Sequence, residues 1–411
     1  MERLSQHKLF QWLLPCLILA LASCSSGGAD IADESQAGPL DTISIESPAK
    51  NNDKYLNQNQ VFDSINYIPL ETTKESLFSE INQLEVVDDL MIVLDWATNS
   101  ILTFNKSGKF LSKIKSKNVR EFAVNGFEKL IVFQDISNAK TYHYSYDGKL
   151  VKSYDNPFIR SNLVFLDSNL VAYYKYFFKE NKDSKFNNFN LFLADRSNNI
   201  QNGFLRFDTA AISYKEVYNS EKQFYKSSHS TYFIQPYDYR IYDITLGKPI
   251  AKYIINIPEA NRLPHDFRTN GKYFESRFDY LTKYSNEVFQ IKDFYVVNSI
   301  AVFKIGASKW NNTFVYDVNN KDKISIYNIL SGPDNNFMPI GEEFYASDIN
   351  SFYRAVRAQE LFKIKFNLAD KIDDSRLPKG LKVFFDTQNN LSNPVIVQMF
   401  PGRNKRLIPG T

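Results

Sequence analysis

Short apolar runs alternate with polar gaps along most of the chain, from about residue 60 onward. The first clear unit lies between residues 81 and 114, where a polar gap and the turn Asn105-Lys106-Ser107-Gly108 separate three such runs. Glycine favours a hairpin turn because it adopts positive φ without a steric penalty. The alternation therefore predicts three successive strands, at Leu90–Leu94, Ile101–Phe104 and Phe110–Ile114.

The same unit returns several times, with connections of different length. A second copy, between residues 121 and 154, has its turn at Gly148, and later degenerate copies have turns near Asn199, Gly247 and Asn320. Repeats of roughly 40 to 50 residues with about four strands each are typical of β-propeller blades. The predicted strands of the second copy are Leu130–Phe133, Thr141–Tyr144 and Leu150–Tyr154.

Counting these turns predicts five blades, and the stretch Phe344–Phe400 has room for a sixth. An early strand at Ile65–Leu70 would close the ring by pairing with the last blade, which would remove two exposed sheet edges. The long insertion Pro258–Ser285 has room for a short helix around Arg277–Tyr284. The strands expected in the sixth blade are Phe362–Phe366, Val383–Phe385 and Val395–Met399.

These elements predict an all-β fold, a six-bladed β-propeller with about four antiparallel strands in each blade. An open pair of β-sandwiches and a β-helix are the alternatives. No boundary rich in Pro, Ser and Gly interrupts residues 60–400, so we predict a single propeller domain over residues 46–404. Aromatic residues make up 15% of the chain, which suits strands that bury rings on one face and meet water on the other.

The first 24 residues have the order of a bacterial lipoprotein signal peptide. Two basic residues precede the apolar segment Leu9–Ala22, which is shorter than the roughly 20 apolar residues that span a bilayer. The segment ends in Leu21-Ala22-Ser23-Cys24, which resembles the lipobox of prolipoproteins. We therefore expect residues 1–23 to be removed by cleavage between Ser23 and Cys24, and the thiol of Cys24 to carry a lipid anchor with palmitate. An ordinary secretory signal and a buried N-terminal helix are the alternatives.

Residues 24–45 begin with a stretch rich in Ser, Gly, Ala and acidic residues, which cannot bury enough apolar surface to fold, so we predict a flexible tether. Ser25 stands where an aspartate would hold an enterobacterial lipoprotein in the inner membrane, which favours the outer membrane. The sequence does not decide between the periplasmic face and the cell-surface face of that membrane. Cys16 and Cys24 are the two cysteines of the sequence, and Cys16 leaves with the signal peptide, so we expect no disulfide.

Basic and acidic side chains are nearly balanced, at 49 Lys and Arg against 46 Asp and Glu. A net charge this small gives no strong field for nucleic acid, and residues of both signs are interspersed along the chain. We therefore expect no nucleic-acid partner and a mixed, solvated surface, with the membrane reached through the lipid on Cys24.

Four segments resemble a known family. They are Tyr67-Ile68-Pro69-Leu70-Glu71-Thr72, the hairpin Ile101–Phe110, the segment Gln235–Tyr242, and Asn393-Pro394-Val395-Ile396-Val397. Together they look like the six-bladed β-propeller lipoproteins of gut-type didermal bacteria, over residues 60 to 400. The resemblance implies the propeller fold and an envelope address, and it implies no activity because most members have none assigned. At Lys115–Phe122 the chain departs from the family, which commonly has a glycine-rich turn there, so a function tied to that turn does not carry over.

Sequence motifs with a defined chemistry are absent from the chain. It has no dinucleotide-binding, P-loop, zinc-protease or nucleophile-elbow motif, and His143, His229 and His265 are too far apart in sequence to form a metal-binding pair. We therefore assign no catalytic residue, no metal site and no cofactor. Aromatic and cationic loop residues are the best candidates for ligand contacts, although such rings also fold onto their own blade. These candidates are Trp96, Arg240, His265 and Trp310.

Two functions fit these observations. The first is a binding or scaffold module whose loops engage an envelope protein or a glycan. The alternative is a channel-centred hydrolase or lyase, lactonase-like, with or without a metal. Three or more carboxylate, Asn or His side chains that converge at one mouth of the central channel would favour the enzyme.

Overall fold

The computed structural model describes residues 40–46, 55–135, 137–158, 162–175, 186–207, 222–402 and 407. The predicted signal peptide, its cleavage site at Ser23, the anchor residue Cys24 and the first part of the predicted tether lie outside these residues. Among the described residues, no helix is long and apolar enough to cross a membrane.

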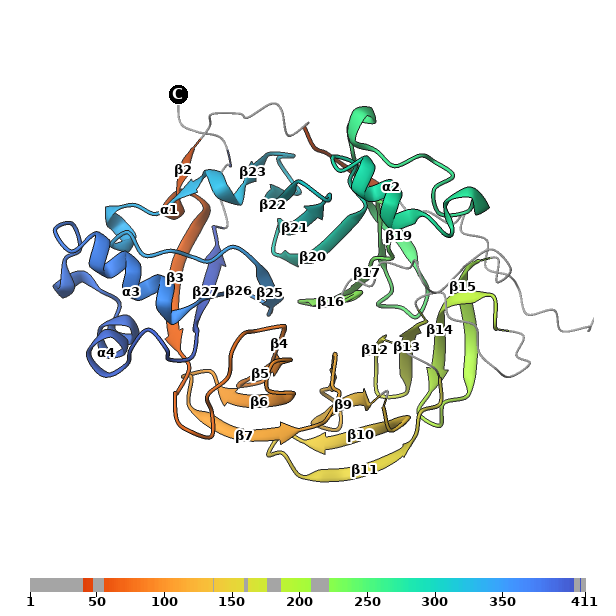
Figure 1. Cartoon of the computed structure of the whole chain (residues 1–411), viewed down its shortest axis with the longest axis horizontal. Coiled ribbons are helices and arrows are strands. Elements are labelled where there is room, and N and C mark those ends of the chain that lie inside the picture. Colours follow the sequence, from red (N-terminus) through yellow and green to blue (C-terminus); the bar gives the residue numbers. More distant parts are fainter. Residues whose placement is uncertain are drawn as a thin grey trace, which may run out of the picture. The chain divides into compact units, whose positions relative to one another are not determined.

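Six small antiparallel sheets form a ring, with the first strand of each sheet nearest the centre (Figure 1). The predicted six-bladed β-propeller is therefore confirmed. Blades 1 to 3 consist of β4 (Gln83–Val87), β5 (Leu90–Asp95), β6 (Ser100–Asn105) and β7 (Phe110–Lys115); β8 (Ala123–Asn125), β9 (Leu130–Asp135), β10 (Lys140–Ser145) and β11 (Leu150–Asp155); and β12 (Asn162–Phe165), β13 (Leu170–Tyr174), β14 (Phe189–Asp195) and β15 (Ile200–Arg206).

The second half of the ring repeats this plan. Blades 4 to 6 consist of β16 (Phe224–Ser227), β17 (Ser230–Phe233), β18 (Arg240–Asp243) and β19 (Ile250–Asn256); β20 (Gln290–Val297), β21 (Ile300–Gly306), β22 (Asn311–Asp317) and β23 (Lys323–Ser325); and β25 (Phe344–Ser347), β26 (Phe352–Val356), β27 (Val395–Pro401) and β3 (Phe62–Pro69).

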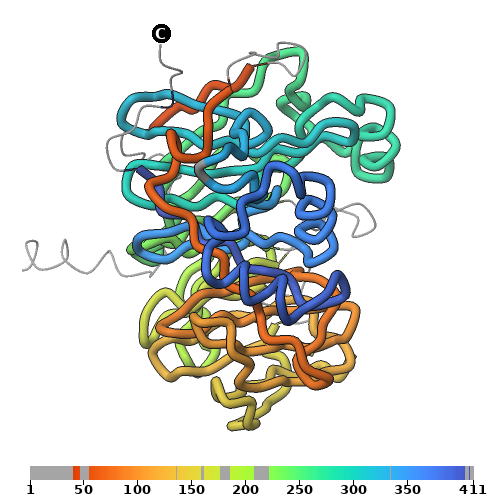
Figure 2. The backbone as a smooth tube through the Cα atoms, turned by 90° about the vertical axis from the view of Figure 1, so that its left-hand side faces the viewer, coloured from red at the N-terminus to blue at the C-terminus, as the bar shows by residue number. Residues whose placement is uncertain are grey.

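The ring closes through its two chain ends, as predicted. Strand β3 pairs antiparallel with β27, with Ile65 opposite Met399 and Tyr67 opposite Val397. Figure 2 shows this early strand running beside the last part of the chain. Because blade 6 takes strands from both ends, the ring cannot open without breaking this sheet.

Two strands predicted for the sixth blade are wrong. Phe362–Phe366 lies in helix α3 (Ala358–Asn367), and Val383–Phe385 lies in helix α4 (Lys379–Thr387). The buried residues of each helix are three positions apart, Ala358 and Leu361 in one and Leu381 and Phe384 in the other, which is a helical period. Both segments are apolar, as predicted, but the spacing of the buried residues is that of a helix and not that of a strand.

The remaining elements lie at the rim of the ring or in its connections. Strand β1 (Asp41–Ser44), in the last part of the predicted tether, adds in parallel to β19 with Ile43 fully buried, so residues 41–44 belong to the sheet of blade 4. The helix predicted at 277–284 is confirmed as α2 (Arg277–Lys283). The other short elements are β2 (Leu56–Asn57), β24 (Ile329–Leu330), α1 (Gln58–Val61), η2 (Glu259–Asn261), η3 (Gly271–Tyr273), η4 (Ile326–Asn328), η5 (Pro333–Asn335) and η6 (Asp374–Arg376).

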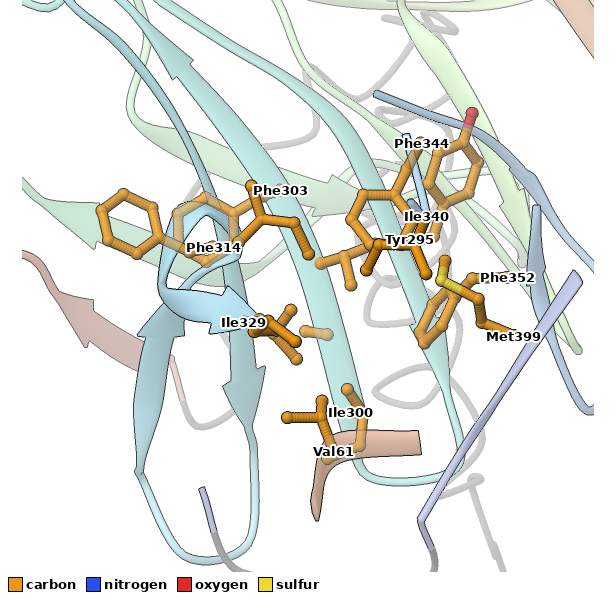
Figure 3. Packing of buried hydrophobic residues seen from close by; sticks show 14 of the residues in the cluster. Val61, Tyr295, Ile300, Phe303, Phe314, Ile329, Ile340, Phe344, Phe352 and Met399 are labelled. Carbon is orange, nitrogen blue, oxygen red and sulfur yellow. The ribbon is translucent and has the colours of Figure 1, made fainter. Parts of the chain in front are cut away.

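Apolar and aromatic side chains fill the spaces between neighbouring blades (Figure 3). In the largest cluster, the rings of Phe303 and Phe314 stack with centroids 5.5 Å apart, and Phe344 packs edge-on against Phe352 at 5.6 Å. Each fully buried side chain of this size stabilises the fold by about 1.5 to 3 kcal/mol. The described part of the chain contains no cysteine, so this packing holds the ring together without a disulfide.

The connections divide the ring into two unlike faces. On the turn face, each connection has two to six residues: 88–89, 106–109, 126–129, 146–149, 166–169, 196–199, 228–229, 244–249, 298–299, 318–322 and 348–351. The opposite face, called the loop face here, carries the long described connections 70–82, 116–122, 257–289, 326–343 and 357–394. Because every blade is an antiparallel meander that starts at its innermost strand, all six inner strands begin at the loop face.

Candidate functional site

Polar residues gather where the inner strands begin, at the loop-face mouth of the central channel. Hydrophobic residues normally dominate the inside of a small ring of strands, so a set of charged side chains here marks a candidate functional site. Two cavities, of about 40 Å³ and 30 Å³, lie among these side chains. The polar residues that line them are Asn82, Gln83, Glu85, Glu121, Asn162, Lys222, Lys226, Lys292, Asp293 and Glu343.

Lys222 lines both cavities and links four blades. Its Nζ lies 2.7 Å from Oε1 of Glu85 in blade 1 and donates to the hydroxyl of Tyr295 in blade 5 over 3.4 Å. That hydroxyl in turn donates to the backbone carbonyl of Tyr345 in blade 6. The chain of contacts fixes the mouth in one arrangement, because moving any one blade would break a hydrogen bond between partly buried groups.

The channel narrows below this mouth. Oγ of Ser227 in blade 4 lies 3.2 Å from Oγ of Ser347 in blade 6, and the Ser227 hydroxyl also accepts from the backbone N–H of Val296. Side chains therefore meet across the centre of the ring. The larger of the two cavities, at about 40 Å³, has room for about two or three water molecules.

Glu343 and Lys226 show how burial acts on the charges of the mouth. Burial works to raise the pKa of Glu343, but its hydrogen bond and ion pair with Lys304 outweigh that effect and lower it. Burial also lowers the pKa of Lys226, whose Nζ donates to the backbone carbonyl of Val124 over 3.5 Å. Both effects follow from the cost of holding a charge away from water.

Asp293 differs from the other acids of the mouth. Burial raises its pKa to about 6, and the nearby charge of Glu343 adds to that effect, while Lys292, Lys304 and Lys222 oppose it. Its side chain lines the larger cavity, and no hydrogen bond to its carboxylate is found in the described part of the chain. A carboxyl group in this state can accept or donate a hydrogen bond near neutral pH.

Two carboxylates of the mouth have fixed partners. Glu85 and Glu343 are held in ion pairs with lysines, and within the described ranges no group of three or more His, Cys, Asp or Glu residues is placed to hold a metal ion. The mouth therefore offers fixed donors and acceptors to a polar group that enters it.

The predicted contact residue Arg240 is tied into a structural ion pair. Its Nε and Nη2 donate to Asp238 at 3.0 and 2.9 Å, and Arg268 from the 257–289 connection donates to the same carboxylate at 2.8 Å. Burial would raise the pKa of Asp238, but the two guanidinium groups outweigh it and hold the pKa well below its usual range. Asp238 and the two arginines therefore hold the 257–289 connection against blade 4.

The other three predicted contact residues lie on the same face without forming one cluster. Trp96 donates from Nε1 to the carbonyl of Arg120 at 2.8 Å and packs in the core between blades 1 and 2. Trp310 is half-buried in the 307–310 turn, which bonds to the 257–289 connection through Lys309 N–H and Ser285 carbonyl at 3.0 Å. His265 is exposed on that connection. Their role as ligand contacts stays a prediction.

Sequence reasoning missed the mouth residues, above all Asp293, Lys222 and Glu343. One signal was available. Lys292-Asp293 interrupts the otherwise apolar and aromatic stretch of β20, and charged residues in the innermost strand of a blade need a partner or a purpose. The sequence could not show that these residues meet at one mouth, because residues such as Lys222 and Glu85 are far apart along the chain.

A family model described as a domain of unknown function, DUF4934, matches residues 40–400. The chain belongs to this family. The match spans all six blades, from β1 through nearly all of β27, and it assigns no activity. No curated protein matches the DUF4934 chain.

Two of the solved structures that are similar to this DUF4934 protein come from Bacteroides species. A "Putative exported protein" from Bacteroides fragilis is 17% identical, with a TM-score of 0.67 over 88% of this chain and 99% of that one. A member of the DUF4221 family from Bacteroides vulgatus is 9% identical, with a TM-score of 0.43 over 84% of this chain and 99% of that one. At such low identity the first likeness shows the propeller fold alone.

Proposed function

We propose that this DUF4934 protein is an outer-membrane lipoprotein, anchored through Cys24, whose propeller is a binding and scaffold module for an envelope protein or glycan. The signal-peptide order of residues 1–24 supports the anchor. The similar Bacteroides fragilis protein, whose name describes export, supports an envelope address. A binding role is supported by the loop face.

The observation that carries the binding role is the difference between the two faces. All long described connections emerge at the face where the charged channel mouth opens, and the opposite face has turns of two to six residues. Long connections on a rigid scaffold are where proteins usually place binding residues. The cavities are too small to enclose a substrate, which favours recognition at the surface over turnover inside the channel.

A pair of exposed positions tests which face binds. Phe278 in the 257–289 connection is 49% exposed, and Leu246 on the turn face is 83% exposed. A photo-crosslinking amino acid at each position, in cells of the native host, should give a discrete cross-linked envelope product from Phe278 and none from Leu246. Equal products from both positions, or a product from Leu246 alone, would contradict binding through the loop face.

The anchor has its own test. Cys24→Ser removes the thiol that would form the lipid thioether, so the variant should be lost from the outer-membrane fraction. Metabolic labelling with a palmitate analogue should mark the wild-type protein and not the variant. A variant that stays in the outer-membrane fraction to the same extent would show that another feature holds the protein in that membrane.

A further inference from the structure

The backbone of β20 turns Asp293 into the channel mouth. The pairing of β20 with β21 shifts register between Lys292 and Tyr295, and Asp293 has a φ of +56° within this bulge. A bulge re-aims a side chain at the cost of a regular ladder, and a left-handed conformation costs a residue with a Cβ roughly 1 kcal/mol. The fold therefore keeps Asp293 in the cavity against two local preferences of the chain.

The charges around the larger cavity balance. Its lining contains two cations, Lys222 and Lys292, and two anions, Asp293 and Glu343. Glu85, which pairs with Lys222, and Lys304, which pairs with Glu343, extend this set without changing the balance. An added ion of either sign would meet no net opposite charge, whereas a neutral group that both donates and accepts would find partners of both kinds.

Hydroxyl groups fit this description. Each hydroxyl donates one hydrogen bond and accepts others, so two adjacent hydroxyls can bridge a carboxylate and an ammonium group. The larger cavity, at about 40 Å³, has room for two such groups and not for a whole sugar ring. The rest of its wall consists of Asn82, Gln83, Tyr225, Tyr295, Phe344 and Tyr345.

We propose that the channel mouth binds the vicinal diol of a neutral terminal sugar, with the carboxylate of Asp293 accepting one hydroxyl hydrogen and a neighbouring lysine donating to the other hydroxyl. This inference rests on the proposed binding function and selects a glycan over a protein as the group recognised at the mouth. The rest of the glycan would lie across the loop face.

The titration of Asp293 gives the site a dependence on pH. Its pKa is raised to about 6 by burial and by Glu343, against the opposing charges of Lys292, Lys304 and Lys222. Glu85, Tyr295 and Tyr345 also surround it, and burial raises the pKa of both tyrosines, so those two stay neutral at pH 5 to 8. Protonation removes the negative charge that strengthens the hydrogen bond from the diol, so binding should weaken as the pH falls from 7.5 to 5.

The test uses the full mature protein and a panel of neutral monosaccharides, namely glucose, galactose, mannose, fucose and N-acetylglucosamine. Saturation-transfer NMR and calorimetry should detect millimolar binding of at least one of them at pH 7.5, at least tenfold weaker at pH 5. Glucuronate and glucosamine, which carry a charge, should bind more weakly than the best neutral sugar. Asp293→Asn should weaken binding at least tenfold at pH 7.5, while Asp89→Asn, at an exposed turn-face position, should leave it unchanged.

The outcomes separate this inference from the function on which it rests. No binding of any neutral sugar, a preference for a charged sugar, or wild-type affinity in Asp293→Asn would overturn the diol site. If cross-linking at Phe278 still gave an envelope product in those cases, the binding module would stand with a different ligand. If sugars bound at the mouth but cross-linking at Phe278 gave no product, the diol site would be supported and binding of an envelope partner through the loop face would be contradicted.

Discussion

The two faces of the ring are built from the same strands, yet their connections serve different ends. On the turn face, backbone conformation fixes the short connections: Gly108, Gly148 and Gly247 all have positive φ. The loop face carries the long connections, which include the helices α2, α3 and α4, and it surrounds a mouth lined by charged side chains. The comparison indicates that one face sets the register of the blades, and that the other is free to carry recognition.

Single residues show the same contrast. Gly108 adopts a left-handed conformation where a turn requires it, and its missing Cβ allows the carbonyl oxygen of Pro69 to approach. Asp293 adopts a left-handed conformation inside a strand, where no turn requires it. Its conformation belongs to the β-bulge of β20, and bulges often re-aim a side chain beside a functional site, which is why Asp293 marks the loop-face end of the channel.

The strongest test of the contrast is Gly108→Ala. A Cβ at this position would lie 2.0 Å from the Pro69 oxygen, and φ is +85°, so the turn must move. We expect a loss of about 4 kcal/mol in the free energy of unfolding, measured by urea titration. Gly126→Ala is the matched control on the same face, because its nearest neighbour atom is 3.8 Å away; its effect should stay within about 0.5 kcal/mol. Similar losses of stability in both variants would show that steric fit at Gly108 does not determine the stability of the turn face.

The loop face also holds a structural residue, and removing it tests how far the contrast reaches. Asn393 is fully buried and joins the segment before β27 to the connection after β3. Its side chain accepts from Phe78 N–H at 3.1 Å and donates to the carbonyls of Glu71 and Ser76 at 2.8 and 3.0 Å. Asn393→Ala leaves these backbone groups without partners, so we expect a loss of about 3 kcal/mol by urea titration.

Asn350→Ala gives the control for that variant. Asn350 is an exposed asparagine on the turn face, and its replacement should change stability by less than about 0.5 kcal/mol. If Asn393→Ala were equally harmless, ring closure would depend on the pairing of β3 with β27 alone.

The repeating part of the fold could be predicted because local signals repeat with it. The outer three strands of blades 1 and 2, the turns at Gly108 and Gly148 and the closure by an early strand follow from alternation and turn chemistry. The sixth blade could not be predicted in the same way, because its first two strands, β25 and β26, are separated from β27 by the helices of the 357–394 connection. Apolar runs in those helices imitated the missing strands.

The candidate site was less predictable than the fold. Candidates chosen by residue type, such as Trp96 and Arg240, lie on the loop face but are engaged with their own neighbourhood. The mouth is assembled from all six blades, so its residues come together through ring geometry, which one sequence does not display. A charged pair in a central strand, Lys292-Asp293, was its one local signal.

Asp293→Asn should stabilise the protein, in contrast to the two losses above. The folded pKa is about 6, above the value of about 3.9 for an unfolded chain, so the folded state holds the proton more tightly. The stabilisation linked to that proton is fully present below about pH 4 and is lost as the pH rises through 6. Asparagine imitates the neutral acid and tolerates positive φ.

Thermal unfolding of Asp293→Asn at two pH values measures this effect. The difference in pKa corresponds to at most about 3 kcal/mol, and we expect about 1 kcal/mol of added stability at pH 7.5 because the side chain is partly open to the channel. At pH 4 the variant and the wild type should unfold within about 0.3 kcal/mol of each other. A variant that is less stable at pH 7.5 would mean that the carboxylate has a partner in the folded protein.

The smallest effect on stability is expected at His265, where the two faces can be compared with one residue type. His265 is exposed on the 257–289 connection and His229 is exposed in the 228–229 turn, so replacing either by alanine should change the free energy of unfolding by less than about 0.5 kcal/mol. Their effects on binding should differ. His265→Ala should reduce the yield of the cross-linked product formed from Phe278 by at least half, whereas His229→Ala should leave it unchanged. Because neither substitution disturbs the fold, equal yields from both variants would remove His265 from the binding surface without weakening the contrast between the faces.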